Sequence, residues 1–162
     1  MPCVLMRLTD REPMVQRERY SRGISIQQLK RDILWNIELL LNSRSHPSRA
    51  ELRNDAEVCN SVLGMGLEDF CGVSHGREER ERLRREILLQ LRNFEPRINP
   101  DSLSVSLIDR EANSGSVVEL EIHGRIEVAP LSEELLFRSR LDLETGVASV
   151  DMSSALRPSG AR

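Results

Sequence analysis

A carboxylate and a guanidinium group flank a proline in the segment Glu95-Pro96-Arg97. A helical pattern precedes it, and proline restricts both its own φ and the preceding residue, so the helix is predicted to end near Asn93 or Phe94. Residues two apart in extended backbone point to the same side, which predicts a fork of opposite charges able to dock another protein. The alternative is a plain helix end with a surface ion pair worth about 0–1 kcal/mol.

Other reactive side chains form no recognisable constellation. Cys59, Cys71 and His75 can be drawn as three zinc ligands, but without a Cys-x-x-Cys pair, buried or inert cysteines are favoured over a metal site. His123 falls on the polar side of an alternating pattern, which favours a solvated histidine over a catalytic one. No Gly-x-Ser-x-Gly motif is present. We therefore expect no catalytic residue, no metal and no cofactor.

Composition indicates one compact domain with tails. The chain has 162 residues, of which 39% are hydrophobic and 30% charged, and its net charge is −3. It is long enough to bury a sizeable core, and this charge balance does not indicate binding to nucleic acid. Lys30 is the only lysine among 23 basic residues. Arginine favours bidentate pairing with carboxylates at interfaces, although a genome rich in G and C would produce the same bias.

The compartment is predicted from the cysteines and the first residues. Three cysteines are an odd number without the spacing of a disulfide framework. Residues 1–7 contain only a few apolar residues before charges begin, which is typical of neither a signal peptide nor a membrane span. We therefore expect a cytoplasmic protein with free thiols and no direct membrane insertion.

The first half of the chain is predicted to be helical. Ser25 and Gln28 resemble a capping box before a helix that reaches about Asn42, with an apolar stripe at Ile26, Leu29, Ile33, Ile37, Leu40 and Leu41. Residues 51–71 predict a short helix that breaks at Gly64 and Gly66.

The third helix is predicted to begin after a cap at Ser74. Its apolar face comprises Leu83, Ile87, Leu91 and Phe94. Its wet face is expected to carry ion pairs four residues apart, Glu78 with Arg82 and Glu81 with Arg85.

The second half alternates with a period of two residues after Pro100, which predicts strands. They cover about 103–107, 118–128, 135–143 and 147–150, with turns at 113–116, 130–133 and 144–146 and a bulge at Gly124. The predicted fold is α+β, with N-terminal helices packed on a four-stranded antiparallel meander whose last strand is an open edge. Residues 1–23 are predicted to be a flexible arm, 24–151 the domain and 152–162 a disordered tail.

Three residue runs stand in a fixed order. They are Leu39–Arg44, Ser61–Phe70 and Glu95-Pro96-Arg97. In this order they resemble a Leu-Leu-Asn-Thr-Arg helix end, a Ser-hydrophobic-hydrophobic-x-Tyr-Gly-Leu-x-Asp segment and a Glu-Pro-Arg signature. These belong to the baseplate proteins of contractile injection machines, a family often labelled lysozyme-like. It includes the type VI secretion component TssE and the small wedge protein of contractile phages. The resemblance covers about residues 25–150, with Met65 where the family usually has tyrosine.

The resemblance implies a structural role in a baseplate. Glu95 and Arg97 are then expected to contact wedge subunits of the TssF, TssG and TssK type, with Pro96 holding their geometry. The strands from Val118 to Val150 are expected to template the first ring of sheath subunits of the TssB and TssC type. Arg97→Ala is expected to impair assembly more than folding.

Two other function classes compete with this interpretation. The family label suggests a peptidoglycan-cleaving enzyme, but a glycosidase needs a carboxyl group that stays protonated, and Arg97 favours the ionised form of Glu95. A small regulatory adaptor that binds one soluble partner is the third class, since a fold alone does not determine function.

Overall fold

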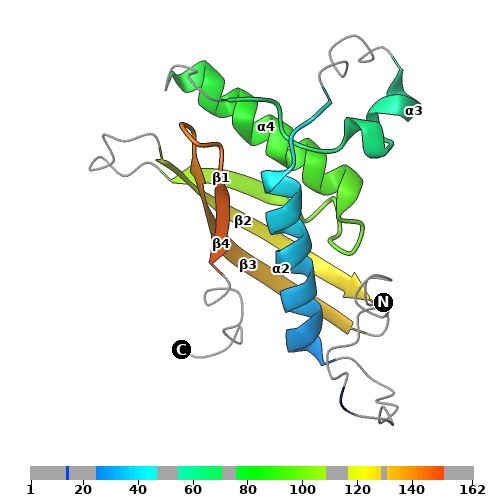
Figure 1. Ribbon diagram of the computed structural model, residues 1–162. Helices are drawn as coiled ribbons and strands as arrows, with labels where there is room; N and C mark the ends of the chain where they lie inside the picture. The colour runs from blue at the N-terminus through cyan, green and yellow to red at the C-terminus, as the bar shows by residue number, and fades with distance from the viewer. Residues whose placement is uncertain are drawn as a thin grey trace.

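The computed structural model describes residues 14, 25–46, 55–70, 76–108, 117–128 and 131–151, and it has the predicted α+β architecture (Figure 1). The predicted arm and tail lie outside these residues, as does the predicted turn at 113–116. The elements in order are α2 (Ile26–Asn42), α3 (Ala56–Cys59), the 3₁₀ turn η2 (Val62–Gly64), α4 (Arg77–Phe94), β1 (Ser104–Ile108), β2 (Val117–Val128), β3 (Leu131–Asp142) and β4 (Ala148–Asp151).

The strands form one antiparallel sheet in the order β1-β2-β3-β4, which confirms the predicted meander. The predicted turn over 130–133 was wrong in extent, because Leu131 already pairs with Val128. The predicted bulge at Gly124 was also wrong, because Gly124 pairs in regular register with Leu135. A Cβ at Gly124 would lie 2.6 Å from Cγ2 of Ile98, so the glycine admits a neighbouring side chain.

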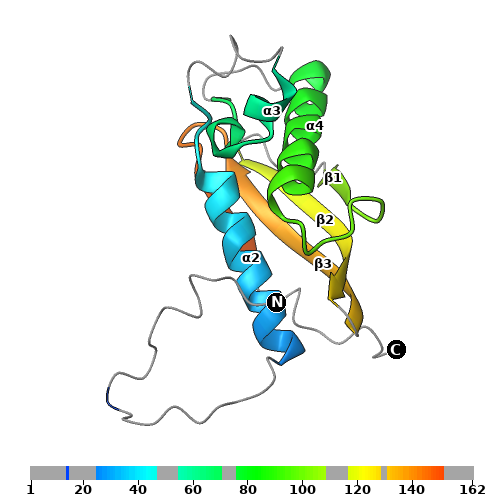
Figure 2. The same cartoon turned by 90° about the vertical axis from the view of Figure 1, so that its right-hand side faces the viewer.

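One face of the sheet is covered by α2 and α4 (Figures 1 and 2). Alternate residues of the long strands point into this layer, where they join the apolar stripes of both helices in a single core. The opposite face carries the intervening polar and charged residues, as the alternation predicted. The largest fully buried side chains are Phe137, Ile33, Leu34, Ile37, Leu41, Leu67, Leu83, Ile87, Leu91, Leu120, Ile122 and Ile126.

Helix α2 begins as predicted, because the Ser25 hydroxyl accepts a hydrogen bond from the backbone N–H of Gln28 at 3.1 Å. The predicted cap of the third helix was wrong. Helix α4 has Gly76 as its N-cap, with no side-chain cap hydrogen bond, and Ser74 lies outside the described residues. Carboxylates at Glu78 and Glu79 in the first turn supply favourable charge there instead.

The wet side of α4 is paired differently from the expectation. Arg82 binds Glu68, which precedes the helix in sequence, and also lies over the ring of Phe70. The predicted pairing of Glu81 with Arg85 is present at 3.7 Å, but Arg84 binds Glu81 more closely, at 2.7 Å. The hydrogen bond from Arg84 lowers the pKa of Glu81.

Candidate functional site

The segment Glu95-Pro96-Arg97 forms a tight turn directly after α4. The backbone N–H of Ile98 donates to the carbonyl of Glu95 at 3.1 Å, which places Pro96 at the second position of a four-residue turn, where proline is favoured. The helix ends at Phe94, as predicted. The expectation of extended backbone between Glu95 and Arg97 was wrong, because the turn hydrogen bond curls the chain.

The two charged side chains of this turn bind each other. Nε of Arg97 lies 2.5 Å from Oε1 of Glu95, and Nη2 lies 2.7 Å from Oε2, so the pair is bidentate. Their side chains are only 14% and 3% exposed, respectively. The pair is therefore not the exposed surface contact of the alternative interpretation. Among the described residues, Nη1 of Arg97 finds no acceptor, although it is buried.

The turn is also fixed to the sheet. The carbonyl of Arg97 accepts a hydrogen bond from the backbone N–H of Glu127 at 3.2 Å, and the N–H of Asn99 donates to Arg125 at 2.8 Å. Between these bonds, Ile98 forms an isolated bridge with Ile126 and is buried. Only Pro96 is exposed within the Glu-Pro-Arg segment. The turn thus presents one proline at the junction of α4 and β2.

The sheet ends in a partly open edge. The predicted edge strand is present as β4, but it pairs only with Arg138–Leu141 of β3. Within the described part of the chain, residues 131–137 of β3 have no strand on that side, and this half of β3 extends beyond β4 in Figure 1. The sequence did not predict this additional edge. Alternation of polar and apolar residues shows which face of a strand is buried, but it does not show how far along its length the strand pairs with a neighbour.

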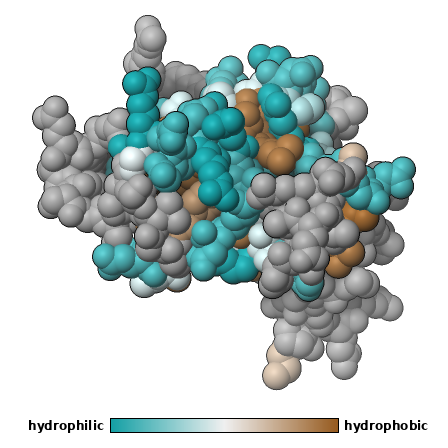
Figure 3. Space-filling model, turned by 90° about the horizontal axis from the view of Figure 1, so that it is seen from above, coloured by the Kyte–Doolittle hydropathy of each residue, from teal (hydrophilic) through white to brown (hydrophobic). Residues whose placement is uncertain are grey.

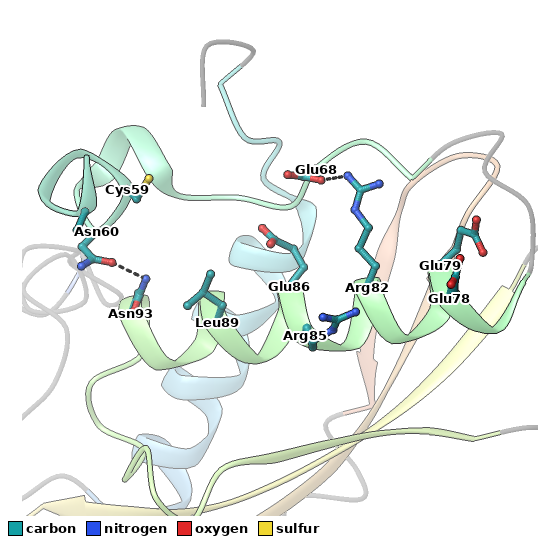
Figure 4. Close-up of a pocket in the computed structure, with 11 residues that line it drawn as sticks. Cys59, Asn60, Glu68, Glu78, Glu79, Arg82, Arg85, Glu86, Leu89 and Asn93 are labelled. Carbon is teal, nitrogen blue, oxygen red and sulfur yellow. Dashed lines mark hydrogen bonds and ion pairs between the residues drawn. The ribbon is translucent and has the colours of Figure 1, made fainter. Parts of the chain in front are cut away.

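A groove of about 940 Å³ separates α3 from α4 (Figure 4). One wall is α3 with Asn60, and Glu68 also lines the groove from the segment after η2, opposite Arg82. The other wall is the outer face of α4, from Glu78 to Asn93. A hydrogen bond of 2.9 Å from the side chain of Asn93 to that of Asn60 joins the two walls at one end.

Gln90 fixes η2, the turn next to this groove. This buried side chain accepts a hydrogen bond from the backbone N–H of Gly66 at 2.9 Å and donates to the carbonyl of Gly64 at 3.0 Å. The groove was not foreseen from the sequence, because its walls meet only through such tertiary contacts.

The surface above this region is mainly hydrophilic. Seen from above, teal side chains cover most of the coloured area, and the apolar side chains form small separate patches (Figure 3). Small scattered patches of this kind are normal on protein surfaces.

The described residues contain no group of three His, Cys, Asp or Glu side chains suited to a metal ion. Cys59 is a partly buried cysteine, outside any disulfide, in the groove wall, whereas Cys71 and His75 lie outside the described residues. His123 is partly buried on the open face of the sheet. Where helices are described, none has the length and apolar character needed to cross a lipid bilayer.

Comparison with known proteins identified a family that the chain matches. A family model described as baseplate wedge protein gp25 matches residues 27–131, which is more than half of the chain. The matched region runs from the start of α2 into β3 and includes the Glu-Pro-Arg turn. No curated protein and no solved structure matched the chain.

Proposed function

The chain belongs to the baseplate wedge protein gp25 family, and from this membership we infer that it serves as a baseplate subunit of a contractile injection machine of the type VI secretion kind. Membership confirms the resemblance on which the structural role was expected. In the proposed role the protein resembles TssE and acts in the cytoplasm, at the membrane-proximal baseplate.

The Glu-Pro-Arg turn is the proposed docking point for wedge subunits of the TssF, TssG and TssK type. Pro96 and the exposed part of Arg97 make the contact, while the buried Glu95 holds the guanidinium group in place. One observation supports this division. The turn is tied to both α4 and β2, and a rigid surface loses little entropy on binding.

The sheet edge is the proposed template for sheath subunits of the TssB and TssC type. An extended segment can add to an edge whose backbone groups are unpaired. The half of β3 beyond β4 offers seven residues, 131–137, for such pairing in the described structure. Sheath nucleation through this edge is the second part of the proposed function.

A structural role is preferred to peptidoglycan cleavage. A glycosidase general acid must reach the scissile oxygen of the substrate. Glu95 does not offer such a group, because its carboxylate is buried and both of its oxygens bind Arg97. We therefore assign no catalytic role to the turn.

The docking role predicts which proteins copurify with the chain. A tagged Pro96→Glu variant places a carboxylate at the exposed tip without removing the Glu95–Arg97 pair. We expect it to recover about tenfold less wedge protein than the wild type, because one well-placed repulsive contact is worth about 1.4 kcal/mol. The amounts are measured by quantitative mass spectrometry of complexes purified from cells that produce the machine.

Pro100→Glu is the matched control, because Pro100 is also an exposed proline close to the same turn. It is expected to recover wedge and sheath proteins at the wild-type level. Equal recovery with Pro96→Glu and wild type would contradict docking through the turn. Recovery of a single soluble protein without baseplate or sheath components would favour the adaptor instead.

A further inference from the structure

The outer side of β4 is engaged by helix α2. The side chain of Asn42 donates to the carbonyl of Ala148 and accepts from its N–H, at 2.9 Å in both bonds. Backbone groups of successive residues in a strand point to alternate sides. The N–H and C=O of Ala148 therefore face away from β3, whereas those of Ser149 and Asp151 face it.

The same alternation fixes which backbone groups of β3 a further strand would meet. Arg138 and Arg140 lie opposite these two residues of β4, so even-numbered residues of β3 direct their N–H and C=O groups to that side. In the vacant half of β3 these are Ser132, Glu134 and Leu136. No strand of the described structure pairs with them there. A segment that docks on this half has to present its own backbone groups to these three residues.

The chain after β4 would meet these groups if the existing register continued. Residues 152–158 lie outside the described structure and equal in number the seven residues of the vacant half. Each step forward along β4 is one step back along β3. A continued β4 would thus place three residues opposite those that point into the vacant half: Ser153 opposite Leu136, Ala155 opposite Glu134, and Arg157 opposite Ser132.

The sequence of this segment continues the alternation of β4. In β4, Ala148 is buried and the residues on either side of Val150 are exposed. With the same period of two residues, Met152, Ser154 and Leu156 fall on the buried face, so two of these three are apolar. The residues between them are small or charged, as the open face of the sheet requires.

The proline in the segment stands at a position that a strand tolerates. Pro158 is an even number of residues from Ala148, so its side without an N–H would point away from β3. Arg157 would lie diagonally across from Glu134, which is exposed on the open face. Opposite charges on neighbouring strands attract at this distance.

We propose that residues 152–158 extend β4 along the vacant half of β3. The end of the chain then occupies the edge at which a sheath strand is proposed to pair. For these seven residues the proposal replaces the disordered tail expected from the sequence. One consequence rests on the proposed function: because an edge pairs with one strand at a time, a sheath strand has to displace the segment.

Hydrogen exchange followed by NMR on the purified full chain tests the pairing. In the wild type, the amides of Glu134 and Leu136 are expected to exchange more slowly than in an unstructured peptide, because they donate to the segment. Ala155→Pro removes an N–H that faces β3 and is expected to make both amides exchange about fivefold faster, the effect of losing about one net hydrogen bond.

Ser154→Pro is the matched control, because the N–H that it removes faces away from β3. It is expected to leave exchange at Glu134 and Leu136 at the wild-type rates. Unprotected amides in the wild type, or equal acceleration by both proline variants, would overturn the proposal. Protection that is lost on dilution and is insensitive to Ala155→Pro would also overturn it, in favour of a second copy of the chain on the edge. The amide of Phe137 points to β2 and reports whether each variant remains folded.

Sheath recovery from cells that produce the machine separates this proposal from the proposed function. If Ala155→Pro leaves the exchange rates unchanged and sheath proteins still copurify, the pairing of residues 152–158 fails and the sheath contact stands. If exchange accelerates in Ala155→Pro but it recovers no more sheath protein than Ser154→Pro, the pairing stands and the sheath contact through this edge fails.

Discussion

Arg97→Ala is expected to lower the free energy of unfolding by about 3 kcal/mol, because it leaves a buried carboxylate without its counter-charge. The side chain of Glu95 is 3% exposed, and Arg97 supplies both of its bidentate hydrogen bonds. Urea denaturation at neutral pH measures the change. The sequence predicted that this substitution impairs assembly more than folding. A test of that prediction therefore has to compare assembly with the measured loss of stability.

A double-mutant cycle isolates the interaction energy between Glu95 and Arg97 from their contacts with other residues. In Glu95→Gln/Arg97→Ala the buried charge is removed together with its partner, so the double variant is expected to be about 1–2 kcal/mol more stable than Arg97→Ala alone. Additive losses from the two single variants would contradict a coupled, buried ion pair. Arg97→Lys is the charge-preserving control and should fall between wild type and Arg97→Ala, because lysine cannot form the bidentate contact.

Gly64→Ala is expected to destabilise the protein by about 3 kcal/mol, at the upper end of overpacking effects. A Cβ at Gly64 would lie 1.8 Å from the carbonyl oxygen of Cys59, and a backbone atom cannot move aside as the end of a side chain can. The movement required would also displace the carbonyl of Gly64 from Gln90. Urea denaturation measures the loss, and hydrogen exchange at the amide of Gly66 reports the local opening.

Val62→Ala is the control for this site, because Val62 belongs to the same 3₁₀ turn but its side chain is 78% exposed. Its effect is expected to stay within about 0.5 kcal/mol. If Gly64→Ala unfolded at the wild-type urea concentration with unchanged exchange at Gly66, the packing described between α3 and η2 would be contradicted.

The regular elements were predictable from sequence because their patterns are local. The stripe from Ile26 to Leu41 and the alternation after Pro100 each report one buried face, and the structure confirms both. Boundaries were less predictable. Gly76 begins α4 without a side-chain cap, and the predicted bulge at Gly124 is a regular pair, since a glycine in a strand can equally admit a neighbouring side chain.

The candidate sites were predictable only in part. The Glu-Pro-Arg segment was identified from its residues, but its burial follows from contacts with β2 across more than 25 residues of chain. Arg82 shows the same limit. The sequence predicted an ion pair with Glu78, four residues away, but Arg82 binds Glu68, which the tertiary fold brings close. The groove between α3 and α4 depends on contacts of this kind alone.

Site-specific photo-crosslinking at position 96 tests docking through the Glu-Pro-Arg turn most directly. A photoreactive amino acid replaces Pro96 in cells that assemble the machine, and the same amino acid replaces Glu144 in a control, since Glu144 is exposed in the turn before β4. The account predicts adducts with a wedge subunit from position 96 and none with wedge subunits from position 144. Assembled machines that yield no wedge adduct from position 96 would contradict it.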